Sequence, residues 1–394
     1  MVFLAIDQGT TNTKALLVAQ SGAILARASV PLATHYPQPG WAEQSALEIW
    51  SSVQAAIAEV ARSGAQLDAI AIANQRETLV VWDAAISQPI CPAILWQCRR
   101  TAEATARLIA DGHDPVVVQA TGLGINPLFP ASKLAWVILN VPQAAVLHRA
   151  GRLRAETVDA SLLWNLTQGA SFATDHSNAS RTQLFDTANL TFSPGLAALF
   201  GASVDVLPRP MPSAASFGVT ASSATALPAG IPVHAMMVDS HAALYGHGVR
   251  APGMVKATYR TGSSLMTLTP GRVARPTVCP ARSPRPTPLA PLIRWSGTSP
   301  SRRKQPPAWP GFWVCPAGRP VRSCPDRSRC GRRGFRAALA GLGASHWDDS
   351  ATGTIPRSIA AGRRPSPRRG TACPPLRSVV MPRQLRGEGV KAIF

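Results

Sequence analysis

Short apolar runs and amphipathic segments alternate along the first 250 residues. Apolar runs at residues 2–6 and 15–19 flank a polar turn, which predicts a β-hairpin, and residues 24–30 would add a third strand. Residues 45–64 have the apolar spacing of an amphipathic helix that is capped by Ser45 and stopped at Gly64. Further strands are expected on both sides of the turn 74–78 and at 93–98, and helices at 133–142 and 159–169. This alternation predicts an α/β fold.

Charge and proline content change sharply after residue 271. Residues 1–271 hold 16 of the 40 basic and 16 of the 20 acidic residues, so the whole net charge of +20 lies in residues 272–394. That tail also holds 19 of the 36 prolines and five of the seven cysteines.

The length of the chain predicts two or three domains, and the first 271 residues suffice for a large hydrophobic core. Few cysteines there, no signal-peptide pattern and no apolar run near the roughly 18 residues of a membrane helix predict a soluble, cytoplasmic protein without a membrane partner.

The turn of the first hairpin has the residue types of a phosphate-binding loop. Gly9 permits close approach of the backbone, and the hydroxyls of Thr10 and Thr11 with successive N–H groups would bind phosphate oxygens. Asp7, at the end of the preceding strand, would hold a Mg²⁺ ion through the water shell of the ion. The alternative is an ordinary Thr-rich turn.

Two further loops carry candidate chemistry. Arg76 and Glu77 form a donor–acceptor pair suited to vicinal hydroxyls, or alternatively an exposed ion pair. Asp239 directly follows the apolar run 231–238, where a carboxylate would accept a proton from an alcohol or cap the helix that follows. His241 is a rival base. Residues 258–270 repeat the strand, Thr/Ser-rich turn and strand of the opening, which predicts a duplicated fold with phosphate held between its halves.

These segments together resemble the FGGY family of carbohydrate kinases, and within it the glycerol kinases. The resemblance covers residues 1–271 and rests on many ordered matches, among them AIDQGTTNTKAL, YPQPGWAEQ, ANQRET, AILWQCRRTAE, SKLAW, TVDASLLWNLTQG and ATDHSNASRTQLFD. It implies an actin-like, ribonuclease H-like pair of domains and transfer of the γ-phosphoryl group of ATP to a small polyol, with glycerol first. A homo-oligomer is an open expectation.

The resemblance implies a role for each matching residue. Asp239 is the catalytic base, and the substrate contacts are Arg76, Glu77, Trp96 and Ser240. The nucleotide contacts are Asp7, Gly9, Thr10, Thr11, Asn12, Thr261 and Gly262, with Asp7 also at the metal. Three positions depart from the glycerol kinase pattern: Leu128 stands in place of Tyr, Ser240 in place of Gln and Arg260 in place of Gly. The first two leave the identity of the polyol open.

The resemblance implies an N-terminal kinase domain at 1–250, the start of a second domain at 251–271, and a tail at 272–394. Within the tail the family pattern returns once, as an island at 337–355. We interpret the rest as translation in shifted reading frames, which yields Arg, Pro, Ala, Gly, Ser and Cys from a GC-rich gene. We therefore expect most of the tail to be disordered or to aggregate, and the chain to be weakly active or inactive.

The basic tail has an alternative interpretation as a polyanion-binding segment of a non-catalytic remnant. It contains no recognised nucleic-acid module, so no specific nucleic-acid partner is expected. Its cysteines form no C-x-x-C pair and have only His346 nearby, which argues against zinc. Its prolines exclude long helices and central strands.

Overall fold

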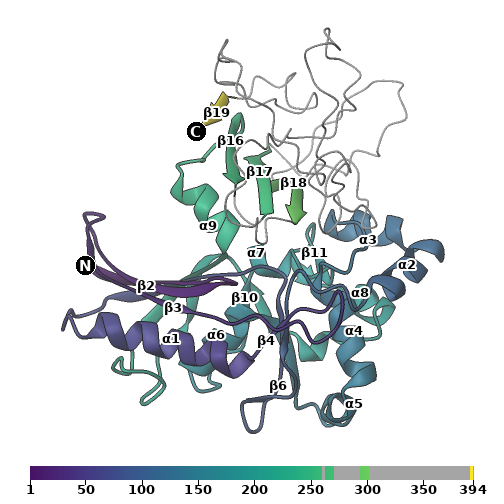
Figure 1. Cartoon of the computed structure of the whole chain (residues 1–394), viewed down its shortest axis with the longest axis horizontal. Helices are drawn as coiled ribbons and strands as arrows, with labels where there is room; N and C mark the ends of the chain where they lie inside the picture. Colours follow the sequence, from purple (N-terminus) through teal and green to yellow (C-terminus); the bar gives the residue numbers. More distant parts are fainter. Residues whose placement is uncertain (260–261, 270–292, 301–390, 394) are drawn as a thin grey trace, which may run out of the picture. The chain divides into compact units, whose positions relative to one another are not determined.

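The structure, a computed structural model, describes residues 1–259, 262–269, 293–300 and 391–393 (Figure 1). The chain divides into two compact units, the first of which is Met1–Ala243 and the second of which begins at Leu244. This division lies a few residues before the boundary expected after residue 250. Within the described part of the chain, none of the helices has both the length and the apolar character that crossing a membrane requires.

A six-stranded sheet forms the centre of the first unit. The expected hairpin and third strand are confirmed, because the first three strands pair antiparallel in sequence order. Strand β1 (Val2–Gln8) also pairs in parallel with β5 (Ala69–Asn74), and β5 pairs in parallel with β15 (Pro232–Val238). In spatial order the strands are β14 (Ala214–Val219), β15 (Pro232–Val238), β5 (Ala69–Asn74), β1 (Val2–Gln8), β2 (Asn12–Ala19) and β3 (Ile24–Pro31).

One face of this sheet packs on two helices, α1 (Ala46–Ala61) and α6 (Val158–Leu166). Alternate residues of β1 and β2, such as Leu4 and Leu17, are buried in that core because successive strand side chains point to opposite faces. Ser45 caps α1 as expected: its side chain accepts a hydrogen bond from the Glu48 backbone N–H at 3.2 Å. Figure 1 shows α1 running beside β2 and β3.

A second sheet lies between this hydrophobic core and a second hydrophobic core of the same unit. Its central strand β6 (Leu79–Asp83) is buried on both sides: Val80 and Trp82 belong to the first core, and Leu79 and Val81 to the second. An unbroken apolar run is typical of such a strand, because neither face meets water. The partners of β6 are β7 (Gln88–Pro89), β8 (Ala93–Ile94) and β9 (Leu153–Thr157), and β8 also pairs with β4 (Glu43–Gln44).

The second core lies under helices that the sequence predicted only in part. The helix expected at 133–142 is α4 (Pro130–Asn140), and Pro142 starts the next helix instead of only closing this one. The helix expected at 159–169 is α6, which ends at Leu166. The other helices are α2 (Ala102–Ala110), α3 (Asp114–Thr121), α5 (Pro142–Arg149), α7 (His176–Ala179), α8 (Pro194–Leu199), a 3₁₀ turn (Val204–Val206) and α9 (Asp239–Gly246).

One expected strand is mostly a turn. Of residues 93–98, only Ala93–Ile94 forms a strand, and the Cys98 N–H then donates to the Leu95 carbonyl at 3.0 Å. The apolar side chains at 93–95 are buried by helices rather than by a longer ladder, so hydrophobicity alone overstated the strand. Two small ladders complete the unit: β10 (Ala173–Asp175) with β13 (Arg209–Met211), and β11 (Phe185–Asp186) with β12 (Thr191–Phe192).

The second unit contains the second expected hairpin. The strands β16 (Met254–Tyr259) and β17 (Gly262–Leu268) pair antiparallel, next to a small core of Leu244, Val249 and Met266. Two tail segments, β18 (Ile293–Pro300) and β19 (Lys391–Ile393), are described as strands, and both lie at the edges of this sheet. The rest of the tail, including the island at 337–355, lies outside the described residues.

Candidate active site

Three parallel strands of the central sheet end at the same level. Gln8, the last residue of β1, is in register with Asn74, the last residue of β5, and Asn74 is in register with Val238 at the end of β15. Parallel strands bring their carboxyl ends to one edge of a sheet, where α/β proteins bind ligands. The Thr-rich loop, the turn with Arg76 and Glu77, and Asp239 therefore start from one edge, although they lie far apart in the sequence.

The pair Arg76 and Glu77 is buried, which rules out an exposed ion pair. Their side chains are 10% and 3% exposed, and Arg76 Nε lies 3.9 Å from Glu77 Oε2. A second arginine, Arg181, contacts Glu77 Oε1 through Nε at 2.8 Å. Burial by itself would raise the pKa of Glu77, but the charges of Arg76 and Arg181 outweigh it, so the pKa lies below its usual value. Glu77 is therefore a fixed, ionised hydrogen-bond acceptor.

A buried lysine holds the backbone of the same turn. Glu77 has a positive φ of 60°, a conformation that non-glycine residues rarely adopt. The Lys133 ammonium donates to the Glu77 carbonyl at 3.0 Å and to the Leu128 carbonyl at 2.7 Å. Burial lowers the pKa of Lys133 to about 7, although the negative charge of Glu77 opposes this. Lys133 thus connects the Glu77 turn with the segment that carries Leu128.

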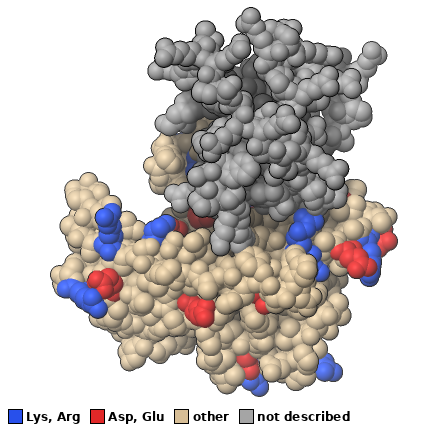
Figure 2. Space-filling view, in the orientation of Figure 1, with Lys and Arg blue, Asp and Glu red and all other residues tan. Residues whose placement is uncertain are grey.

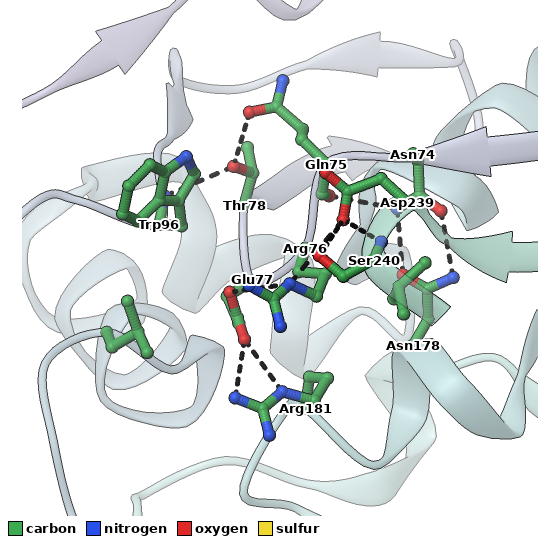
Figure 3. Close-up of polar contacts among 12 residues, drawn as sticks. Asn74, Gln75, Arg76, Glu77, Thr78, Trp96, Asn178, Arg181, Asp239 and Ser240 are labelled. Atoms are coloured by element: carbon green, nitrogen blue, oxygen red, sulfur yellow. Dashed lines mark hydrogen bonds and ion pairs between the residues drawn. The ribbon is translucent and has the colours of Figure 1, made fainter. Parts of the chain in front are cut away.

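Asp239 lies on the other side of Arg76 from Glu77. Its Oδ1 atom is 3.7 Å from Arg76 Nε, and it accepts hydrogen bonds from the Ser240 N–H and hydroxyl at 2.5 and 3.1 Å. Figure 3 shows Arg76 between the two carboxylates. Loss of hydration next to the surrounding protein raises the pKa of Asp239, although the charge of Arg76 and the Ser240 hydrogen bonds oppose this. Because 43% of the side chain is exposed, a small molecule can reach this carboxylate.

His241 stands two residues further along. It is buried at 8% exposure on α9, whereas Asp239 is open. The difference in access favours Asp239 over His241 as the group that meets a substrate.

The Thr-rich loop closes on itself. The Gly9 N–H donates to the Asn12 carbonyl at 3.0 Å, and a Cβ atom at Gly9 would come within 3.1 Å of that oxygen. A side chain at this position would crowd the Asn12 carbonyl, so glycine suits this close approach. Asp7 is half exposed and forms an ion pair of 2.9 Å with Lys14, a residue to which the sequence assigned no role. Lys14 adds a positive charge beside the loop.

Asp7 is the candidate metal ligand. Among the residues that the structure describes, three or more His, Cys, Asp or Glu side chains nowhere gather as a metal cluster. A lone half-exposed carboxylate fits Mg²⁺, which keeps most of its water ligands, but does not fit a metal that needs several protein ligands.

Trp96 reaches the Thr-rich loop from the turn after β8. Its indole Nε1–H donates to Thr10 Oγ1 at 3.1 Å, and its backbone N–H donates to Thr78 Oγ1 at 3.3 Å. The expected substrate contact and the expected phosphate loop are thus directly hydrogen-bonded.

The remaining expected residues belong to the second unit. Gly262 begins β17, where it pairs with the strand β18. Thr261 and Arg260 lie outside the described residues.

Sequence reasoning assigned no role to several polar residues that support this site. They are buried or hydrogen-bonded to the expected residues: Gln8, Gln44, Gln75, Thr78, Lys133 and Arg181. Gln75 and Thr78 flank Arg76 and Glu77, so proximity in sequence was a usable signal for these two. Nothing in the sequence distinguished Arg181 from an exposed arginine.

The comparison with protein families decides the identity of this fold. The profile of the "FGGY family of carbohydrate kinases, N-terminal domain" matches residues 2–246. The chain belongs to the FGGY family of carbohydrate kinases. The expected α/β, actin-like fold of this family is confirmed for the first unit of the chain.

Several relatives and solved structures are similar to this chain. An apulose kinase from Pectobacterium atrosepticum is 44% identical over 270 residues, which are 68% of this chain and 54% of the relative. A glycerol kinase from Acaryochloris marina is 36% identical over 372 residues, 89% of this chain and 72% of the relative. The crystal structure of Plasmodium falciparum glycerol kinase with ADP matches with a TM-score of 0.65 and 28% identity over 68% of this chain and 54% of that one. The chain spans about half the length of several of its curated relatives.

Proposed function

We propose that the chain derives from an ATP-dependent kinase that phosphorylates a hydroxyl group of a small polyol, with glycerol as the leading substrate. The observation that carries the proposal is the placement of Arg76 between the ionised Glu77 and the open Asp239, at the strand ends where the Thr-rich loop also begins. Family membership and the similarity to glycerol kinases support it.

In the proposed reaction the polyol is held by Arg76 and Glu77 against Trp96. Arg76 donates to substrate oxygens and Glu77 accepts from hydroxyl groups. Asp239 accepts the proton of the attacking hydroxyl, whose oxygen forms a bond to the γ-phosphorus as the bond to the bridging oxygen of ADP breaks. The raised pKa of Asp239 makes it a stronger base than an ordinary aspartate.

We propose that the backbone N–H groups of residues 9–12 and the Lys14 ammonium bind the phosphates of the nucleotide, together with the expected contacts Thr261 and Gly262. Mg²⁺, when bound near Asp7, would neutralise phosphate charge. Asp7 and Lys14 would then share the neighbourhood of the phosphates, since their side chains already form an ion pair.

The choice of polyol depends on positions that differ from the glycerol kinase pattern. Leu128 and Ser240 replace larger polar residues, and one relative is named an apulose kinase while many are glycerol kinases. Glycerol is the leading candidate substrate, and erythritol or another short sugar alcohol is the alternative.

We also propose a cytoplasmic protein, since the described cysteines Cys91 and Cys98 are free thiols.

The state of the tail bears on activity. The Acaryochloris marina alignment covers more of the chain than residues 1–271 contain, which supports the family-like island in the tail. We propose that shifted reading frames separate the retained pieces, and that the chain as it stands is impaired.

A second candidate function is favoured by the +20 charge of the tail: a non-catalytic polyol-binding remnant with a polyanion-binding tail. Calorimetry on the full chain with glycerol and with duplex DNA separates the candidates. Glycerol binding that is lost in Arg76→Met and kept in the surface control Arg107→Met supports the kinase site. Salt-sensitive DNA binding by the polyol-binding chain, without ATP-dependent phosphorylation, would support the second candidate, whereas a chain that binds no polyol would overturn both.

A further inference from the structure

Gln75 lies at the centre of a hydrogen-bond network that joins the Thr-rich loop to Trp96. We propose that Gln75 is a positioning residue that fixes both ends of Trp96 and thereby couples the nucleotide loop to the polyol-binding wall. What Trp96 and the loop bind rests on the proposed function; the connection between them rests on the contacts below.

The side chain of Gln75 uses its full hydrogen-bonding capacity. It follows β5 directly and is 1% exposed. Its Nε2 group donates to Gln8 Oε1 at 3.2 Å and to Gln44 Oε1 at 3.0 Å, and its Oε1 atom accepts from the Thr10 and Thr78 hydroxyls, each at 3.0 Å. Two donated and two accepted bonds are all that an amide can make.

The orientation of this amide is dictated by its neighbours. Gln8 Nε2 donates to the Gly9 carbonyl at 3.0 Å, and Gln44 Nε2 donates to the Thr10 carbonyl at 2.7 Å. Both neighbouring side chains therefore turn their oxygens toward Gln75, which must present its NH₂ group to them. Its own oxygen then faces the two threonines.

The Thr10 hydroxyl is both a donor and an acceptor in this network. It donates its single proton to Gln75 Oε1 and accepts from the Trp96 indole. It has no second proton to give to a phosphate oxygen. Thr10 is thus assigned to holding Trp96, which leaves the Thr11 hydroxyl and the backbone N–H groups of the loop for phosphate.

Thr78 provides the second connection. It donates to the same oxygen of Gln75 and accepts the Trp96 backbone N–H. One amide oxygen therefore positions the indole end of Trp96 through Thr10 and the backbone end through Thr78. Figure 3 shows the Gln75–Thr78–Trp96 connection.

The test follows the Trp96 indole N–H resonance in ¹⁵N-tryptophan-labelled full-length chain, assigned with Trp96→Phe, together with calorimetric glycerol affinity. Gln75→Leu is expected to shift the Trp96 resonance upfield, although Gln75 does not contact the indole, and to raise the glycerol Kd about tenfold, as expected for one buried hydrogen bond. Should that variant not fold, Gln75→Met preserves the side-chain length and carries the same expectation.

The Thr10 variants separate coupling from general loosening. Thr10→Val is expected to reproduce the effects of Gln75→Leu, and Thr10→Ser, which keeps the hydroxyl, to restore both readouts. The double variant Gln75→Leu, Thr10→Val is expected to be no worse than either single one. The control Gln54→Leu removes a glutamine that donates to the Ala224 carbonyl, away from this network, and should move neither readout.

An unmoved Trp96 resonance in Gln75→Leu, or additive effects in the double variant, would overturn the proposal. If the wild-type chain binds no glycerol, the proposed function fails, but the resonances still decide the role of Gln75.

Discussion

Arg76 lies near two carboxylates, Glu77 and Asp239, whose pKa values shift in opposite directions. Glu77, enclosed by Arg76 and Arg181, has a lowered pKa and stays ionised. Asp239, on the open side of Arg76, has a pKa raised by the surrounding protein. A pair of titratable groups whose environments push their pKa values apart is typical of an acid–base site. The proposed assignment of Glu77 to substrate binding and of Asp239 to proton transfer rests on this difference.

Asp239→Asn removes the proton acceptor while keeping the shape of the side chain. Any polyol-dependent ATP turnover should fall by roughly 10²–10⁴, with KM little changed, because a general base acts in the transition state. The acidic limb of the wild-type pH–rate profile should lie above the ordinary aspartate range, since the protonated form, favoured as pH falls, cannot act as base. Full turnover in Asp239→Asn would exclude Asp239 as the base.

The buried carboxyl group of Glu156 should make the stability of the chain depend on pH. Burial, with the nearby Asp159 and Asp175, raises the pKa of Glu156 to about 8. The unfolded chain ionises Glu156 near 4.5, so between about pH 4.5 and 8 the folded state holds a proton that the unfolded state has lost. Stability must therefore fall as pH rises through this window, by at most about 1.4 kcal/mol per pH unit from this group.

Glu156→Gln should flatten that slope and stabilise the chain at pH 8 relative to wild type, with little change at pH 4.5. The amide oxygen still accepts from the Thr157 N–H, which donates to Glu156 Oε1 at 3.0 Å. Urea unfolding at several pH values measures the effect. Asp159, whose pKa burial raises to about 7, keeps part of the slope. The exposed control Glu103→Gln should not alter it, and an unchanged slope in Glu156→Gln would show that Glu156 titrates normally.

At the scale of elements, helices and strands with one solvent-exposed and one buried face were predicted well. The amphipathic helix and its Ser45 cap, the hairpin and the third strand all appear where expected. Segments buried on both sides were predicted less well, because an apolar run does not distinguish a strand from a turn packed under helices. Residues 95–98 are the example.

Ser45→Ala should destabilise the first unit by about 1 kcal/mol, since the Glu48 N–H loses its acceptor at the start of α1. The matched control is Ser51→Ala at an exposed position inside the same helix, where alanine should be neutral or slightly stabilising. Urea denaturation of both variants gives the comparison. Equal stability of the two would show that the cap contributes nothing measurable.

At the scale of the whole molecule, charge divides the chain. Residues 1–271 carry no net charge, and basic and acidic side chains are interspersed over the described surface seen in Figure 2. A polyanion would therefore meet the tail rather than this surface. Such binding by a preparation would reflect the +20 charge of the tail and would not by itself indicate a biological partner.

The full chain is expected to show weak or no ATP-dependent phosphorylation of glycerol in a coupled assay, because we propose that shifted reading frames interrupt the second domain after residue 271. The gene read in all three frames beyond codon 271 should contain the missing family segments. Robust turnover by the 394-residue chain would contradict the expected impairment. A confirmed, unbroken frame that encodes this same tail in expressed protein would contradict the frame shifts.

The sequence by itself determined the opening hairpin with its third strand and amphipathic helix, the α/β class, the family and the loops that carry candidate chemistry, because these depend on local periodicity and on ordered motifs. Only the tertiary structure decided that Arg76 and Glu77 are buried, that Arg181 and Lys133 hold the Glu77 turn, and that Gln75 commits the Thr10 hydroxyl. These contacts join residues 56–104 positions apart. They exist because parallel strands end in register and helices close over them, a condition that local sequence does not encode.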